Sequence, residues 1–286
     1  MRGSKLAAGL VPALVMVAIL AFFFVTSRSD PRAAGKHQGG RPALVQPRPA
    51  TTAPTETREP LPSTVMVPCY EDIENGGLPI TRSGGVSRYG AAANQQRARS
   101  ENIWSTTGRC SRLTIGQRVS YSFDILPQLG STGSSVWETV SQLQGPTTGG
   151  TWLGPPVALV IESGQWRVAG GYPVPNDYGG SPSGAGYTKR LSKVKVDTWQ
   201  HWAFDVLLGG AGTGSVTAWL DGTKVVDGFK PPRGTMYTAG GGFSHAYLQL
   251  KSGLYTGAGK KADIPTRQRV VLIRNMRSDI SKRPGS

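Results

Sequence analysis

Residues 245–255 carry polar and aromatic side chains at alternate positions, a spacing that suits a binding surface. In a β-strand, alternate side chains point to the same face of the sheet, so the apolar residues of this stretch would face a core. The polar set on the opposite face is His245, Tyr247, Gln249, Lys251 and Tyr255. Gly253 would leave a gap in that row. Such a row forms either the floor of a ligand site or an ordinary solvent-exposed face.

The short signatures of several other enzyme classes are absent from the chain. It has no Gly-x-Ser-x-Gly nucleophile elbow, no phosphate-binding P-loop and no His-Glu-x-x-His zinc motif. It also lacks Glu-x-Asp-x-x-Glu, a paired-carboxylate pattern of β-sandwich glycosidases. Two cysteines exclude a four-cysteine zinc site. The glycine-rich residues 209–215 lie between two strand patterns with no helix after them, which predicts a hairpin loop and not a dinucleotide site.

The elements that would hold such a face are short strands. Charged residues make up only 17% of the 286 residues, while glycine (39) and proline (21) are frequent, which disfavours long helices. Alternation or short apolar runs mark residues 119–125, 157–161, 202–208, 216–220 and 270–273. Asp221-Gly222 is typical of a tight β-hairpin turn. Residues 65–283 are therefore predicted to form one all-β domain, a two-sheet sandwich or jelly roll.

Lys251, Gly253 and Tyr255, in the order Lys-x-Gly-x-Tyr, resemble the end of the Tyr-x-Lys-x-Gly-x-Tyr motif of jelly-roll polysaccharide lyases. This heparin-lyase-like group includes the alginate and glucuronan lyases. Further segments follow the order of that group: Gly116–Pro127, Val140–Gly145, Pro155–Glu162 and Trp202–Val226. The similarity spans roughly residues 95–280 and implies a concanavalin A-like sandwich with a substrate groove on one sheet.

The resemblance also implies roles for individual residues of this groove. Catalytic roles fall on Tyr255, Lys251, Arg99 and Gln142. Substrate-binding roles fall on Arg97, Glu101, Gln144, Gln249 and Tyr247. Three positions depart from the family pattern, because Gln144 stands in place of a histidine, Gln249 in place of a tyrosine and Asn102 in place of a leucine.

The chemistry implied by the resemblance is β-elimination, in which the C5 proton of a uronate is removed and the C4–O4 bond breaks. Charge-assisted hydrogen bonds must neutralise the sugar carboxylate, a role for Arg99, Gln142 and Lys251. Tyr255 would take the proton and return it to the leaving oxygen, since nearby cations favour a tyrosinate. Without the family histidine, a single tyrosine would carry a syn elimination.

Gln144 also fits a second hypothesis, a non-catalytic carbohydrate-binding module that has lost catalysis. A third class, an envelope structural or nucleic-acid-binding protein, would likewise combine aromatic residues with cations. The net charge is +15, and residues 65–286 carry +10 from 24 basic and 14 acidic side chains, so an anionic partner is expected. We favour an acidic polysaccharide and expect a monomer with no nucleic-acid partner and no cofactor. A structural calcium would fit such a sandwich, although no Asp-rich loop requires one.

The first 64 residues are predicted to be a targeting segment and a tether. Leu6–Val25 is uncharged and long enough to cross a bilayer core of about 30 Å, so residues 1–27 are a signal-anchor or, alternatively, a cleaved signal peptide. Residues 28–64 are rich in proline and poor in large apolar residues, which predicts a disordered linker. We expect a single-pass membrane protein with an extracytoplasmic domain, or a secreted one. The excess of basic residues after Val25 argues against that orientation.

Cys69 and Cys110 are the two cysteines of the chain. In an exported protein such a pair is expected to form a disulfide, because the compartment is oxidising. Two buried free thiols are the alternative, favoured if the domain faces the cytosol.

Overall fold

The computed structural model describes residues 59–128, 135–148, 154–170, 187–237 and 244–282. The predicted membrane segment and almost all of the predicted linker lie outside these ranges. The chain divides into two units, and all strands described here belong to the unit of residues 55–286. Within the described ranges, no helix is long and apolar enough to cross a membrane.

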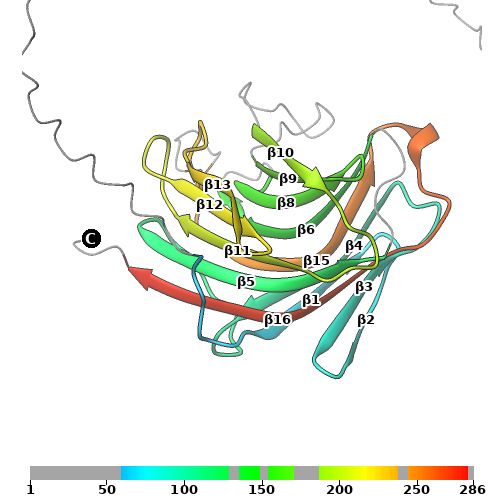
Figure 1. Ribbon diagram of the computed structural model, residues 1–286, viewed down its shortest axis with the longest axis horizontal. Helices are drawn as coiled ribbons and strands as arrows, with labels where there is room; N and C mark the ends of the chain where they lie inside the picture. Colours follow the sequence, from blue (N-terminus) through cyan, green and yellow to red (C-terminus); the bar gives the residue numbers. More distant parts are fainter. Residues whose placement is uncertain (1–58, 129–134, 149–153, 171–186, 238–243, 283–286) are drawn as a thin grey trace, which may run out of the picture. The chain divides into compact units, whose positions relative to one another are not determined.

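Two seven-stranded antiparallel sheets pack against each other (Figure 1). In order across the first sheet, the strands are β1 (Val67–Glu74), β4 (Arg97–Ser105), β15 (Gln249–Ala258), β6 (Val136–Gln144), β8 (Val157–Glu162), β9 (Gln165–Gly170) and β10 (Tyr187–Lys193). In order across the second sheet, they are β13 (Thr223–Phe229), β12 (Ser215–Leu220), β11 (Gln200–Leu207), β5 (Gln117–Pro127), β16 (Arg269–Lys282), β3 (Val86–Ala91) and β2 (Gly77–Ser83). The prediction of an all-β two-sheet sandwich is confirmed.

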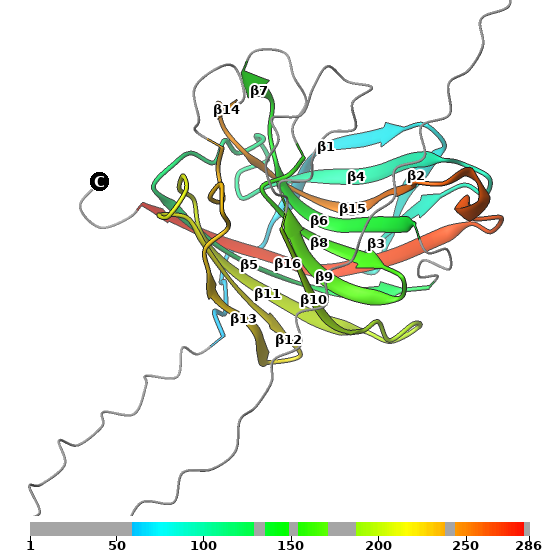
Figure 2. The same ribbon diagram turned by 90° about the horizontal axis from the view of Figure 1, so that it is seen from above.

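A small third sheet pairs β7 (Thr147–Thr148) with β14 (Ser244–His245) and is set off from the two large sheets (Figure 2). Because β7 follows β6 and β14 precedes β15, this sheet lies beyond one end of the β6–β15 pair. A short 3-10 helix covers Lys261–Asp263.

The core lies between the two large sheets and is built from alternate residues of their strands. The predicted alternation of residues 119–125 is confirmed by the complete burial of Val119, Tyr121, Phe123 and Ile125. Tyr121 stacks on Phe204 of β11 with ring centroids 4.9 Å apart. Trp166 of the first sheet meets Trp202 of the second edge to face at 5.3 Å. Burial of each such side chain contributes about 1.5–3 kcal/mol, so these contacts hold the sheets together.

The turn between β12 and β13 has the geometry predicted from its sequence. Leu220 pairs with Thr223, which leaves Asp221 and Gly222 as a two-residue loop. Both loop residues have positive φ, +50° and +78°, as a type I′ hairpin requires. Residues 209–215 likewise connect β11 to β12, so the prediction of a hairpin loop there is confirmed.

A charged side chain is buried between the sheets, behind the strand segment that carries Tyr255. Arg269 of β16 is 2% exposed and reaches across the core to donate a hydrogen bond to Thr256 Oγ1 of β15. Glu138 of β6 is fully buried and pairs in register with Thr256. Burial lowers the pKa of Arg269, and the Glu138 carboxylate acts against that shift. The cluster links β16 to both β15 and β6.

The described chain begins along the outer face of the second sheet. Thr64 Oγ1 donates to Asp279 Oδ1 at 2.9 Å, and Arg277 Nη1 donates to the carbonyl of Ser63 at 3.0 Å. These bonds fix the segment before β1 to strand β16.

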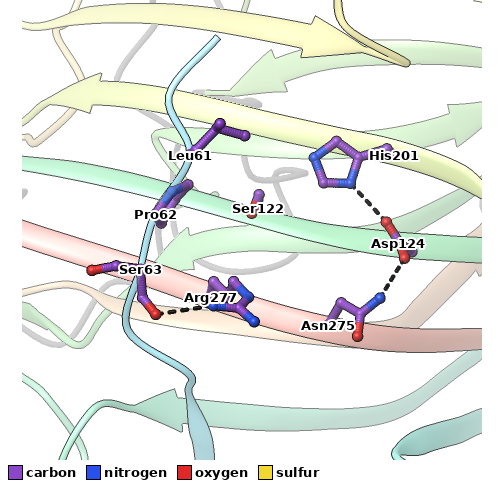
Figure 3. A pocket seen from close by; sticks show the side chains of 8 residues that line it. All are labelled: Leu61, Pro62, Ser63, Ser122, Asp124, His201, Asn275 and Arg277. Carbon is purple, nitrogen blue, oxygen red and sulfur yellow. Dashed lines mark hydrogen bonds and ion pairs between the residues drawn. The ribbon is translucent and has the colours of Figure 1, made fainter.

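Beside that segment lies a pocket of about 540 Å³ on the second sheet (Figure 3). It is lined by Leu61, Pro62, Ser63, Ser122, Asp124, His201, Asn275 and Arg277. His201 Nδ1 and Asn275 Nδ2 each lie 2.7 Å from a carboxylate oxygen of Asp124. Burial alone would raise the pKa of Asp124, but these hydrogen bonds and one from Arg274 lower it. None of the residues predicted for the substrate groove lines this pocket.

The predicted disulfide between Cys69 and Cys110 is present. Cys69 lies in the edge strand β1, and Cys110 follows β4, the strand that pairs with β1. The bond therefore fastens the edge of the first sheet to its neighbour.

Replacing both cysteines with serine should lower the free energy of unfolding by about 3–4 kcal/mol, because the bond constrains a long loop in the unfolded chain. Guanidinium unfolding curves of the oxidised wild type, the reduced wild type and the double variant measure this loss. The reduced wild type serves as the control and should match the variant. Equal stability of the oxidised and reduced wild type would contradict the prediction.

Candidate active site

The predicted catalytic residues lie on the outer face of β4, β15 and β6, which we call the candidate face. Ala98 and Trp104 of β4, like Leu250 and Leu254 of β15, point into the core. The residues that alternate with them, among them Arg99 of β4 and Lys251 and Tyr255 of β15, therefore point outward. Pairing across the strands places Tyr255 opposite Arg99, and Lys251 opposite Gln142. The fold thus brings together side chains that are more than 100 residues apart in the chain.

A buried carboxylate lies at the centre of the candidate face. Glu101 of β4 is 0% exposed. Gln142 Nε2 lies 2.8 and 3.0 Å from its two oxygens, and Arg99 Nε lies 3.4 Å from Oε2. Burial raises the pKa of Glu101, while the charges of Arg99 and Lys251 and the hydrogen bond from Gln142 act against that rise. The side-chain amide of Gln142 is therefore held in place by its hydrogen bonds to the Glu101 carboxylate.

Edge strand β1 adds two acidic residues that the sequence analysis did not assign to the site. Asp72 Oδ2 lies 2.9 Å from Lys251 Nζ and 3.1 Å from Arg99 Nη1. Glu74 Oε2 lies 3.4 Å from the same Arg99 nitrogen. Burial alone would lower the pKa of Arg99, but the carboxylates around it raise it. Alternation of Tyr70, Asp72 and Glu74 before an Asn-Gly turn is the sequence signal for this strand.

The ring of Tyr255 is held between a cation and an aromatic side chain. The guanidinium carbon of Arg99 lies 4.3 Å from the centre of the tyrosine ring. Trp137 of β6 meets the same ring edge to face, with centroids 5.0 Å apart. Trp137 also packs against Ala158 and Val160 of β8, which give the candidate face an apolar part. The sequence analysis did not assign Trp137 to the site. Since neighbouring side chains in a strand point to opposite faces and Val136 is buried, Trp137 points outward.

Gly253 explains the glycine of the Lys-x-Gly-x-Tyr motif. Its φ is +146°, and the register between β15 and β6 shifts between Ser252 and Tyr255. A Cβ at this position would come within 2.3 Å of the carbonyl oxygen of Ser100 in β4. Only glycine fits this close approach, which lets Lys251 and Tyr255 share one face across the irregularity.

Four predicted binding residues lie farther along these strands. Gln144 and Gln249 pair with each other at the end of β6 and the start of β15, beyond Gln142 and Lys251. Arg97 lies at the opposite end, across from Gly257. Tyr247 precedes β15, and the Arg112 guanidinium carbon lies 4.7 Å from the centre of its ring. These four side chains therefore flank the central group and do not form part of it.

The expectation that His245 shares a face with Lys251 and Tyr255 is wrong. The chain is not one continuous strand, because β14 ends at His245 and β15 begins at Gln249. His245 is 4% exposed and stacks on Tyr237 with centroids 5.2 Å apart. Burial lowers its pKa. A period-two argument fails across such an interruption.

Metal ligands are not apparent in what the structure describes. Within the ranges given above, no group of three or more His, Cys, Asp or Glu side chains is arranged to hold a metal ion.

A model of the family described as "Polysaccharide lyase" matches residues 72–275. The chain belongs to the polysaccharide lyase family. The match begins at Asp72, so it includes the last part of β1, Asp72–Glu74, as well as the candidate face. The resemblance drawn from the Lys-x-Gly-x-Tyr segment is confirmed, as is the lyase class that it implied. A comparison with curated protein sequences gives no match.

One solved structure shows the same fold, and a second superposes with a lower score. The endo-β-1,4-glucuronan lyase of the fungus Trichoderma reesei superposes with a TM-score of 0.53 at 16% identity, covering 73% of this chain and 89% of that one. A family 7 alginate lyase from Zobellia galactanivorans gives a TM-score of 0.48 at 16% identity, covering 71% and 80%. The first of these likenesses supports the jelly-roll sandwich.

Glu101→Gln should become more stable relative to the wild type as the pH rises. A carboxyl with a raised pKa stabilises the folded state only while it is protonated, so its contribution is lost above its unfolded value of about 4.5. Urea unfolding between about pH 5 and pH 8 measures the difference at each pH. Glu71→Gln, on the exposed part of β1, controls for the loss of one charge. A difference that shrinks with pH would contradict the assignment.

Proposed function

We propose that this protein binds an acidic, uronate-containing polysaccharide along the candidate face and cleaves it by β-elimination. The observation that carries the proposal is the position of Tyr255, with the Arg99 guanidinium 4.3 Å from its ring centre, in a domain of the polysaccharide lyase family. The glucuronan and alginate lyases with similar folds act on uronate polymers by their names, which supports this substrate class.

In the proposed reaction, the Tyr255 oxygen, as tyrosinate, takes the C5 proton of the uronate on the reducing side of the C4–O4 bond that breaks. The sugar on the nonreducing side of that bond is the leaving group. The electrons of the C5–H bond form the C4=C5 double bond, and the C4–O4 bond breaks. The leaving O4 oxygen then takes the proton from Tyr255, so that atoms and charge balance. The Arg99 guanidinium lies 4.3 Å from the centre of the Tyr255 ring, so a positive charge stands beside the proposed base.

Neutralisation of the sugar carboxylate falls to the remaining polar groups of the face. Arg99 and Lys251 supply the cations, and Gln142, whose amide is oriented by Glu101, supplies a hydrogen-bond donor. Gln144 can form hydrogen bonds but does not exchange protons near neutral pH. The proton transfers therefore fall to Tyr255 alone.

A second candidate function is a non-catalytic carbohydrate-binding module. One observation favours it: the cations of the site already pair with carboxylates of the same chain. These are Asp72 and Glu74 of edge strand β1 and the buried Glu101 of β4. Together with Gln144, these pairs suit a surface that holds a glycan without activating its C5 proton.

We further propose that the domain works outside the cytoplasm, tethered to the membrane through Leu6–Val25 or secreted after cleavage. The bonded Cys69–Cys110 pair supports this location, because disulfides persist in oxidising compartments. The proline-rich linker predicted for residues 28–64 would then separate the domain from the bilayer.

Tyr255→Phe should reduce the elimination rate by about 10²–10⁴-fold while binding is kept, because the variant removes only the oxygen that carries the proton. The rate is followed by the ultraviolet absorbance of the unsaturated uronate, and binding by calorimetry. Tyr70→Phe, which removes a phenol from exposed strand β1, is the matched control and should keep the wild-type rate. Equal rates for Tyr255→Phe and the wild type would remove Tyr255 from the mechanism.

Gln144→His tests whether one tyrosine suffices. If Tyr255 carries both proton transfers, the added imidazole should leave the elimination rate unimproved. The same absorbance assay, run on wild type and variant over a pH series, gives the comparison. A large gain in rate would instead identify the natural protein as a weakened relative of histidine-containing lyases and favour the binding-module hypothesis.

A further inference from the structure

The charges of the candidate face do not add up to a free cationic site. Its two central cations, Arg99 and Lys251, contact three carboxylates, those of Asp72, Glu74 and Glu101. A uronate that binds here meets cations that already have partners. To pair with these cations, the carboxylate of the uronate must replace one of the three carboxylates of the protein. Which one it replaces bears on the specificity of the site.

Asp72 is the carboxylate that joins the two cations. One of its oxygens lies 2.9 Å from Lys251 Nζ and 3.1 Å from Arg99 Nη1. Strands β1, β4 and β15 lie side by side in that order (Figure 2). Since Lys251 belongs to β15, the Asp72 side chain extends over β4 instead of staying at the edge of the sheet. It lies where the carboxylate of a sugar bound to both cations would lie.

Glu101 is not the carboxylate that a bound uronate would replace. It is fully buried, and Gln142 holds both of its oxygens. Displacing it would leave an unpaired charge inside the sheet, which is costly.

Asp72 is better placed to move. Its side chain is 13% exposed, and it belongs to β1, an edge strand with one hydrogen-bonding side unpaired in the first sheet. The register of β1 is already irregular between Pro68 and Tyr70, and Tyr70 is 60% exposed. The disulfide at Cys69 holds the β1 backbone in place, so the movement required is a rotation of the Asp72 side chain and not an opening of the strand.

We propose that Asp72 occupies the place of the substrate carboxylate on Arg99 and Lys251, and that a bound uronate replaces it. Asp72 is then a specificity-determining residue, because a neutral sugar cannot displace it from the cations. This inference rests on the proposed uronate-binding function of the same face.

Removing the charge of Asp72 should therefore strengthen uronate binding. Asp72→Asn is expected to lower the Kd of a uronate oligosaccharide about tenfold, because the sugar no longer competes with an internal carboxylate. If Asp72 instead positions the two cations, the same change should raise the Kd.

The experiment measures binding by calorimetry in the full-length Tyr255→Phe background, in which turnover is expected to be slow. The two ligands are a glucuronan oligosaccharide and the same oligosaccharide with its carboxyls reduced to alcohols. Glu71→Gln is the matched control, since it removes an equal charge from the neighbouring residue. Glu71 Oε1 lies 2.7 Å from Arg82 Nη1, so its partner is Arg82 and not one of the two central cations.

Tighter binding of the charged oligosaccharide by Asp72→Asn, with no change for Glu71→Gln or for the reduced oligosaccharide, is the expected result. Weaker or unchanged binding by Asp72→Asn would overturn the inference, as would an equal gain in Glu71→Gln. Failure of every variant to bind glucuronan, alginate or heparin oligosaccharides would overturn both this inference and the proposed function. Tighter binding without elimination by the Tyr255-containing protein would overturn the proposed chemistry alone.

Discussion

A carboxylate with no exposure to solvent, that of Glu101, is the constraint on which the candidate face depends. A buried charge is tolerated only when it is paired and hydrogen-bonded. Gln142 and Arg99 supply those partners from β6 and from β4 itself. Satisfying Glu101 thus fixes Gln142 and also Arg99, which lies against the Tyr255 ring, before any ligand binds. Preorganisation of this kind is what electrostatic catalysis requires.

The opposite side of the same strands carries a second buried charge. Arg269 extends from the second sheet to Thr256, the neighbour of Tyr255, and lies under the influence of Glu138. The segment of β15 that carries Tyr255 is therefore fixed from the core as well as from the outer face. The disulfide adds a third restraint at the edge, where it fastens β1 to the chain after β4. Asp72 lies on this fastened strand and can still be 13% exposed.

The parts of this structure that follow from local pattern could be predicted from the sequence. Alternation in residues 119–125 and the Asp221-Gly222 turn depend only on neighbouring residues, and both have the predicted form. The Lys-x-Gly-x-Tyr segment identified the family because its glycine meets a steric demand, the close approach to Ser100.

The missed residues depend on strand order and register. Asp72 reaches Lys251 only because β1 lies beside β4 and β4 beside β15, an arrangement that no local pattern contains. His245 was assigned to the same strand as Lys251 and Tyr255, but that strand begins only at Gln249. Contacts between segments far apart in the chain are beyond a period-two argument.

The central claim is that the candidate face carries out an elimination, and mass spectrometry of the products tests it most directly. The full-length protein is incubated with glucuronan, alginate and heparin, and the masses of the fragments are measured. The account predicts fragments whose new nonreducing end is unsaturated, lighter by one water than the corresponding hydrolysis products. Fragments that have each gained a water, or intact polymers that bind the protein without being cut, would contradict it.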